Sequence, residues 1–236
     1  MPLNWSTTDK SGANHGIKAL VYGGAGSGKT TLCGTAPSPL IISAEAGLLS
    51  LRAKHIPVLE VKTVQDVWDA LAWCRTDAAK NGIQTVCLDS VSEIVETVLS
   101  NEKKKTKDPR QAYGEMATLS IDLVKSFRDL AGFHVLITAK QSTSQDAVTG
   151  VSRVGPTAPG QQVGPALPYL FDLVFHAATD KDAQGKTYHY LRTHAAFNAD
   201  AKDRSGALDE MEYPDFSNIV GKILGAAPAA PATTGV

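Results

Sequence analysis

Short apolar runs alternate along this chain with segments that carry apolar residues at helical spacing. The apolar runs stop at glycine, proline or polar residues, and they predict buried strands at 17–22, 40–44, 58–61, 85–89 and 134–139. The segments between them predict helices at 30–36, 63–80, 92–99 and 111–130. Strands that alternate with helices predict an α/β fold whose central sheet is mostly parallel and is flanked by helices.

Several details sharpen this expectation. Thr63 and Asp66 have the spacing of a capping box and open the helix at 63–80, whose predicted core face comprises Val64, Val67, Trp68, Leu71 and Ala72. The polar, basic stretch 102–110 interrupts the helical pattern, and residues 141–166 are rich in Gly, Pro, Ser, Thr and Gln, which predicts a long loop. Strands at 173–178 and 187–193 predict an antiparallel pair, and a last helix is expected at 215–224.

The pattern indicates one domain at 16–225. Residues 1–15 are polar and are expected to form a flexible arm, while the low-complexity tail 226–236 is expected to be unstructured. The formal net charge is -1, so a site for a polyanion must come from local clustering of charge. The three cysteines lie in apolar segments and form no C-x-x-C pair, which favours a reducing cytoplasm over a disulfide framework or a zinc site. No apolar run approaches the roughly 20 residues that cross a bilayer, so no membrane contact is expected.

A glycine-rich motif follows the first predicted strand and opens the first predicted helix. It satisfies G-x-x-x-x-G-K-[ST] in full and predicts an ATP site built from Gly23, Gly24, Ala25, Gly26, Ser27, Gly28, Lys29, Thr30 and Thr31. Glycine lets the backbone N–H groups converge on phosphates without steric conflict. Lys29 is expected to reach the β- and γ-phosphates, and the Thr30 hydroxyl to ligate Mg²⁺.

Two carboxylates follow neighbouring strands and complete the predicted site. Asp89 ends an apolar strand and is expected to hold Mg²⁺ through water. The next residue, Ser90, is not an acid, so the group that polarises the attacking water must come from elsewhere. Glu45 is the candidate, because it ends the strand after the glycine-rich loop. The structural alternative for Glu45 is a carboxylate that caps the helix at 48–51.

The segments I-S-A-E-A at 42–46 and C-L-D-S-V at 87–91 resemble paired motifs of RecA-family recombinases, and the match extends loosely over residues 17–205. The resemblance implies a RecA-like P-loop ATPase core, with Glu45 catalytic and Asp89 on the metal. It also implies that Gln141, at the end of the strand at 134–139, senses the γ-phosphate. The compact chain, together with residues 165–172 and 201–204, is similar to the Sak-four group of bacteriophage single-strand annealing proteins.

The family resemblance further implies two mobile loops that face single-stranded DNA, at 102–113 and 142–162. The first carries Lys103, Lys104, Lys105, Lys107, Arg110 and Tyr113, and the second carries Arg153. The cations would contact phosphates and Tyr113 would stack on a base. The second loop has no aromatic residue, which argues against base-specific readout there. A solvated helix end is the structural alternative for the lysine run.

Lys202 and Arg204 have the spacing of cations that RecA proteins extend to a neighbour's γ-phosphate, which would make hydrolysis depend on a homo-oligomer. An ordinary surface loop is the alternative. The predicted function is therefore that of an ATP-dependent ATPase that binds single-stranded DNA in phage recombination. We expect it in the host cytoplasm, where a separate single-stranded-DNA-binding protein is a candidate partner. A small-molecule kinase and a non-hydrolysing partner of a recombinase are the competing classes.

Overall fold

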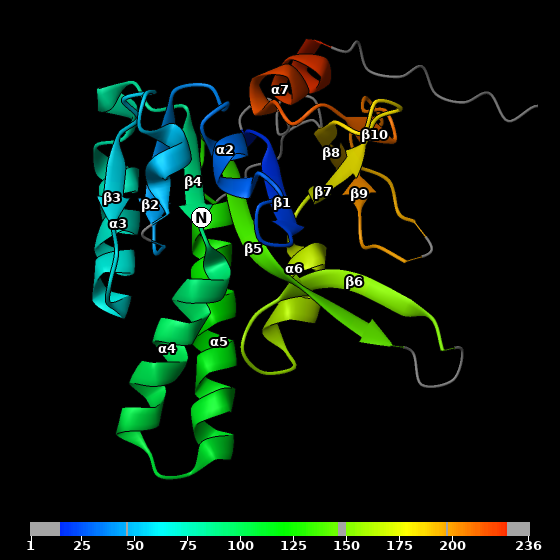
Figure 1. The fold of residues 1–236 in the computed structure, drawn as a ribbon. Coiled ribbons are helices and arrows are strands. Elements are labelled where there is room, and N and C mark those ends of the chain that lie inside the picture. The colour runs from blue at the N-terminus through cyan, green and yellow to red at the C-terminus, as the bar shows by residue number, and fades with distance from the viewer. Residues whose placement is uncertain (1–14, 46, 146–149, 197, 226–236) are drawn as a thin grey trace, which may run out of the picture.

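The computed structural model describes residues 15–45, 47–145, 150–196 and 198–225; the predicted arm, apart from His15, and the predicted tail lie outside these ranges. A single sheet runs through the described chain in the order β10-β8-β7-β1-β5-β4-β2-β3, with β6 beside β5 and β9 beside β7 (Figure 1). Its strands are β1 (Lys18–Gly23), β2 (Pro39–Ser43), β3 (Val58–Glu60), β4 (Thr85–Asp89), β5 (His134–Gln145), β6 (Ser152–Thr157), β7 (Leu173–Lys181), β8 (Thr187–Arg192), β9 (Lys202–Asp203) and β10 (Met211–Glu212). The helices are α2 (Lys29–Cys33), η1 (Leu48–Leu51), α3 (Val64–Thr76), η2 (Ala79–Asn81), α4 (Val91–Lys105), α5 (Pro109–Arg128), α6 (Val163–Leu170) and α7 (Phe216–Gly225).

Strands β7, β1, β5, β4, β2 and β3 are parallel, whereas β6, β8, β9 and β10 join the sheet antiparallel. This confirms the predicted α/β architecture with antiparallel strands toward the C-terminus. The central strands are apolar without alternation because helices cover both of their faces. In β1, Leu20 and Tyr22 face the core beneath α3, α4, α5 and α6, while Ala19 and Val21 face the core beneath α2, η1 and α7.

The capping box is confirmed in α3, but the helix and its buried face differ from the prediction. Thr63 accepts a hydrogen bond from the Asp66 N–H, and the Asp66 carboxylate accepts one from the Thr63 N–H. The helix ends at Thr76, because Asp77 leaves helical geometry, and the short helix η2 replaces its predicted last turn. The fully buried residues are Val67, Ala70, Leu71 and Cys74; Val64 and Trp68 are half-buried and Ala72 is exposed.

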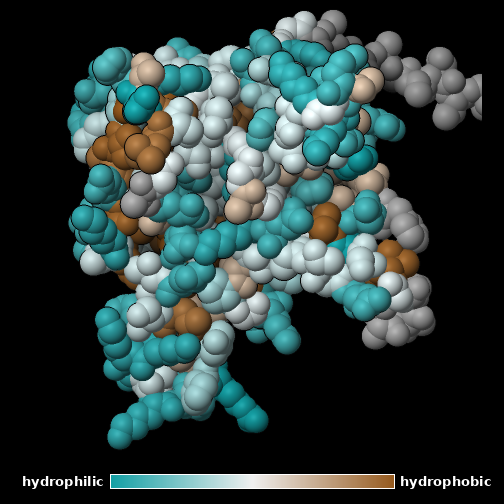
Figure 2. All heavy atoms as spheres, viewed as in Figure 1, coloured by the Kyte–Doolittle hydropathy of each residue, from teal (hydrophilic) through white to brown (hydrophobic). Residues whose placement is uncertain are grey.

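The stretch predicted as the first DNA-facing loop is mostly helical, so the prediction of a loop there is wrong, while its contact with DNA stays a prediction. α4 continues through Lys103, Lys104 and Lys105, where cations suit the negative end of the helix dipole. α5 begins only a few residues later, with Asp108 as its N-cap and Pro109 in its first turn. The two helices form a hairpin that projects below the sheet in Figure 1, and its end is hydrophilic in Figure 2.

The long loop predicted at 141–166 is also wrong for most of its length. β5 continues to Gln145 and pairs antiparallel with β6, from Lys140 opposite Thr157 to Gln145 opposite Ser152. Residues 146–149, at the tip of this hairpin, lie outside the described part of the chain. The hairpin extends beyond the core, so its strands need no apolar residues and give no hydrophobic pattern. Pro156 is accommodated in β6, whose partner in the sheet is β5, while the segment 198–200 bonds to the other side of β6 at Val154.

Candidate functional site

The glycine-rich loop between β1 and α2 has a backbone that requires its glycines. Gly26 and Gly28 adopt φ values of 74° and 92°, in the left-handed region where glycine is favoured. A Cβ at Gly23 would collide with the carbonyl oxygen of Ala177 in the adjacent strand β7. The loop therefore brings its main chain close to the sheet. The Ser27 N–H donates to the Gly24 carbonyl oxygen over 3.3 Å, whereas the N–H groups of Gly26 and Gly28 have no backbone partner among the described residues and are available for an anion. This is the geometry that the motif predicts for phosphate binding.

Lys29 and Ser27 supply the polar side chains of the loop. The Lys29 ammonium donates hydrogen bonds to the carbonyl oxygens of Gly23 and Gly24, each over 2.9 Å. Burial lowers the pKa of Lys29, and the nearby carboxylates of Glu45 and Asp89 oppose that shift. The Ser27 hydroxyl is buried, and it has no hydrogen-bond partner among the residues that the structure describes. A buried hydroxyl without a partner beside a glycine cradle fits a site that receives phosphate oxygens.

Thr30 and Asp89 meet as the sequence predicts for a magnesium site. Asp89 is 2% exposed at the end of β4, and its Oδ2 accepts a hydrogen bond from Thr30 Oγ1 over 2.7 Å. Its Oδ1 accepts a hydrogen bond from Thr138 Oγ1 over 2.5 Å, which fixes the orientation of the carboxylate. Hydroxyl and carboxylate oxygens are the donors that Mg²⁺ prefers, so these two residues fit the ion. Within the described ranges, no group of three or more His, Cys, Asp or Glu residues could hold a metal.

Glu45 follows β2, on the same edge of the sheet as Asp89, because Ser43 pairs in register with Asp89. Glu45 Oε1 accepts a hydrogen bond from Ser90 Oγ over 2.5 Å, and its backbone oxygen accepts one from Ser43 Oγ. Gly47 is the N-cap of η1 and no side chain caps that helix, so the capping alternative for Glu45 is not what the structure shows. Glu45 lines the same pocket as Lys29 and Thr30.

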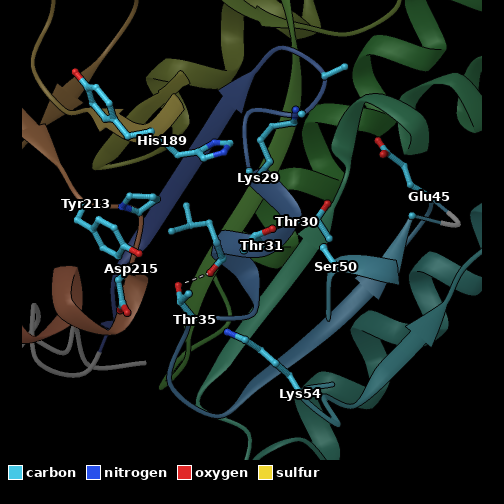
Figure 3. A pocket seen from close by; sticks show the side chains of 17 residues that line it. Lys29, Thr30, Thr31, Thr35, Glu45, Ser50, Lys54, His189, Tyr213 and Asp215 are labelled. Atoms are coloured by element: carbon cyan, nitrogen blue, oxygen red, sulfur yellow. Dashed lines mark hydrogen bonds between the residues drawn. The ribbon is translucent and has the colours of Figure 1, made fainter. Parts of the chain in front are cut away.

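This pocket has a volume of about 1000 Å³, and residues that the sequence did not predict line it together with the glycine-rich loop and Glu45. Figure 3 shows His189, Tyr213 and Asp215 on one side of α2, and Ser50 and Lys54 on the other. His189 Nδ1 lies 3.3 Å from the Ser27 backbone oxygen, and a Cβ at Gly28 would lie 3.4 Å from the same nitrogen. His189 and Tyr213 come from the chain's last quarter and carry no local motif, so only the fold reveals them.

The remaining predicted catalytic residues lie outside this pocket. Gln141 Oε1 lies 3.0 Å from His176 Nε2, and His176 stacks on Tyr22 with ring centroids 5.1 Å apart. Lys202 donates to the Pro168 carbonyl oxygen over 2.7 Å, and Arg204 pairs with Asp172 over 3.2 Å. β9 borders the amino end of β7, whereas the glycine-rich loop follows the carboxyl end of β1. Lys202 and Arg204 are therefore at the opposite edge of the sheet from their own chain's loop, and their action on a neighbour stays a prediction.

The predicted DNA-binding residues fall into free and paired groups. Lys105 pairs with the buried carboxylate of Glu102 over 2.6 Å, and Arg153 donates from Nε to Asp200 over 2.8 Å. The ammonium of Lys103 lies 5.4 Å from the centroid of the Tyr113 ring. Lys104, Lys107 and Arg110 are exposed, and no ion pair engages them in the part of the chain that the structure covers.

A glycine-rich phosphate loop, a Thr–Asp pair suited to magnesium and a glutamate beside them define a P-loop ATPase on a mostly parallel α/β sheet. The sequence model of the AAA domain family matches residues 15–205. This chain belongs to that family.

Among solved structures, a KaiC-like protein from the hyperthermophilic archaeon Pyrococcus horikoshii is similar to this chain. The TM-score is 0.42 and the sequence identity 14%, over 77% of this chain and 80% of that one. The search among curated proteins gives no match. In the ranges that the structure describes, no helix has the length and apolar character needed to span a membrane.

Proposed function

We propose that this protein is an ATP-dependent single-stranded-DNA-binding ATPase that acts in phage recombination or strand annealing. The observation that carries the proposal is the cationic end of the α4–α5 hairpin. Residues 102–113 hold five cations and two carboxylates, and one of the carboxylates, Glu102, is buried against Lys105. This local excess of cations is suited to a polyanion, because the chain as a whole has no net positive charge that would attract one.

The hydrolytic step uses residues that share one edge of the sheet. Glu45 accepts a proton from a water molecule whose oxygen attacks the γ-phosphorus. The bond from that phosphorus to the bridging oxygen breaks, and ADP and phosphate leave. Lys29 would hold the β- and γ-phosphates, while Thr30 and Asp89 would hold Mg²⁺, which neutralises phosphate charge when bound. The Ser90 hydroxyl positions the Glu45 carboxylate through the hydrogen bond described above.

Contacts at the β4–α4 junction support a dependence of DNA binding on ATP. Ser90 contacts Glu45, and Ser92, at the start of α4, bonds to β5 and β6. Lys140 of β5 forms ion pairs with Glu93 and Glu96 of α4. The α4–α5 hairpin and the β5–β6 hairpin both project downward from the sheet in Figure 1. A change in the position of the Glu45 carboxylate on nucleotide binding can therefore alter the positions of both hairpins.

The direct test measures binding of a labelled single strand with ATP, ADP and no nucleotide, and measures ATPase activity with and without that strand. The wild type is expected to bind in the ATP state, with affinity falling with salt by a slope of about −0.7 for each phosphate contact. Lys29→Ala should lose ATP binding and with it the nucleotide-dependent binding of DNA. Glu45→Gln should bind ATP but hydrolyse it on the order of 10²- to 10⁴-fold more slowly. Absence of DNA binding by the folded, ATP-bound wild type would defeat the proposal.

A further inference from the structure

A second pocket lies between the first turns of α5 and the segment that enters α6, apart from the nucleotide pocket. Its volume is about 580 Å³, within the range of about 300–1000 Å³ that is usual for sites of small organic groups. In Figure 1, the turn that precedes α6 lies beside α5. The residues that matter for its chemistry are Arg110, Tyr113, Met116, Gly160, Gln161 and Gln162. The pocket thus joins the two segments that the sequence presented as separate loops.

One wall of this pocket is aromatic. Tyr113 is 39% exposed, so part of the residue is available to a ligand, whereas Met116 is buried. Gly160 approaches both side chains with φ of 79°, and a Cβ there would lie 3.2 Å from Met116 Cε and 3.3 Å from Tyr113 Cδ1. The absence of a side chain at Gly160 therefore keeps the space beside the ring open. The Lys103 ammonium lies 5.4 Å from the centroid of the Tyr113 ring, which is a cation–π contact.

The rim of the pocket carries polar side chains that are available for a ligand. Across the described ranges of the chain, no hydrogen bond or ion pair holds the side chains of Arg110, Gln161 or Gln162, and all three residues are exposed. An amide offers both donors and an acceptor, which can pair with the edge of a heterocycle. A guanidinium offers a fork of donors to a phosphate. An aromatic face, amides and guanidinium together suit a flat heterocycle that is attached to an anion.

We propose that this pocket receives one nucleobase of a single DNA strand. Tyr113 stacks on the base, Gln161 and Gln162 hydrogen bond to its edge, and Arg110 contacts a flanking phosphate. Lys104 and Lys107, at the end of the α4–α5 hairpin, contact phosphates farther along. Bases in a duplex are stacked on each other, so the pocket selects a single strand. This inference rests on the proposed DNA-binding function, and it adds contacts with a base from the second segment, for which the sequence argues only against base-specific readout.

The test compares a labelled oligo-dT with an abasic deoxyribose-phosphate strand of equal length, by fluorescence anisotropy with a non-hydrolysable ATP analogue. We expect the wild type to bind oligo-dT on the order of tenfold more tightly than the abasic strand, because stacking on an aromatic side chain favours a base. Tyr113→Leu should remove this ratio and keep binding to the abasic strand. Tyr113→Phe should restore the ratio because it keeps the ring. Lys104→Ala, the control, should weaken binding to both strands equally.

The outcomes separate this inference from the function on which it rests. Equal binding of both strands by the wild type, or an unchanged ratio in Tyr113→Leu, overturns the base pocket and leaves DNA binding intact. Absence of binding to either strand defeats the proposed function itself. Displacement of Tyr113-dependent binding by free dTMP at the oligonucleotide's own concentration, or tighter binding of oligo-U, would overturn the assignment to a DNA strand. An unchanged far-UV circular dichroism spectrum, together with an unchanged thermal transition, verifies that each variant folds.

Discussion

The hydroxyl of Ser92 donates a hydrogen bond to the carbonyl oxygen of Thr157 over 2.7 Å, across 65 residues of sequence. The same hydroxyl accepts a hydrogen bond from the backbone N–H of Lys140 over 2.9 Å. Ser92 is 1% exposed, so water cannot replace either partner. One buried side chain therefore ties α4 to both strands of the β5–β6 hairpin, two residues after the serine that contacts Glu45.

Ser92→Ala is expected to reduce the difference in DNA affinity between the ATP and ADP states while ATP affinity stays near that of the wild type. The Lys140 N–H and the Thr157 carbonyl would be left buried without a partner. This should lower the free energy of unfolding by about 1–3 kcal/mol and the melting temperature by several degrees. Ser120→Ala is the matched control, because the buried Ser120 hydroxyl has no partner among the described residues. Equal effects of the two substitutions on nucleotide coupling would refute the assigned role of Ser92.

Thr30→Val tests the magnesium pair. It removes the hydroxyl that donates to Asp89 while keeping the shape of the side chain. The concentration of free Mg²⁺ that gives half-maximal ATPase activity should rise about tenfold or more, because one oxygen ligand is lost. Binding of ATP measured in excess EDTA should change little, since Lys29 and the loop amides remain. An unaltered dependence of activity on Mg²⁺ would show that Thr30 does not serve the ion.

His189→Ala tests the wall that the last quarter of the chain builds against the glycine-rich loop. Loss of the ring beside Gly28 and Ser27 should weaken ATP binding several-fold, by about 1 kcal/mol, and raise KM more than it lowers kcat. His55→Asn is the comparison, because His55 is exposed outside the pocket and has φ of 50°, which Asn tolerates. Titration calorimetry with ATP·Mg²⁺ supplies the affinities, and matching affinities for the two variants would count against a contribution from His189.

The buried ammonium of Lys18 should make the free energy of unfolding depend on pH in the alkaline range. It is 3% exposed and donates to the carbonyl oxygens of Leu130 and Phe133, and burial lowers its pKa to about 8 from 10.5. Between these values the unfolded chain binds the proton and the folded chain does not, so the free energy of unfolding should rise as pH rises from about 8 to 10.5. The rise should be on the order of 1–3 kcal/mol.

Lys18→Met provides the comparison, since it removes the titrating group while filling similar space. Its free energy of unfolding should be lower than that of the wild type, because two carbonyl oxygens lose their donor. The gap between the two proteins should widen with pH over the same window. Chemical denaturation at several pH values measures it, and a constant gap would exclude Lys18 as the source.

Local patterns in the sequence determined the parts of this protein that depend on neighbouring residues. Glycines at fixed offsets predicted the phosphate loop, and acids at the ends of apolar strands predicted Asp89 and Glu45. Parallel strands place their carboxyl ends on one edge, which is why Asp89 reaches Thr30 and Glu45 reaches Ser90. The sequence also predicts the capping box at Thr63, because its partner Asp66 is only three residues away.

Tertiary structure decided what depends on residues far apart in the chain. His189 meets Ser27 across 162 residues, and no local spacing signals such a contact. The β5–β6 hairpin forms by backbone pairing beyond the core, so it leaves no apolar alternation to recognise. Lys103, Lys104 and Lys105 interrupt the apolar repeat but extend α4, because charged side chains at an exposed helix end need no buried face. Only the folded chain brings Tyr113 beside Gly160 and opens the pocket between them.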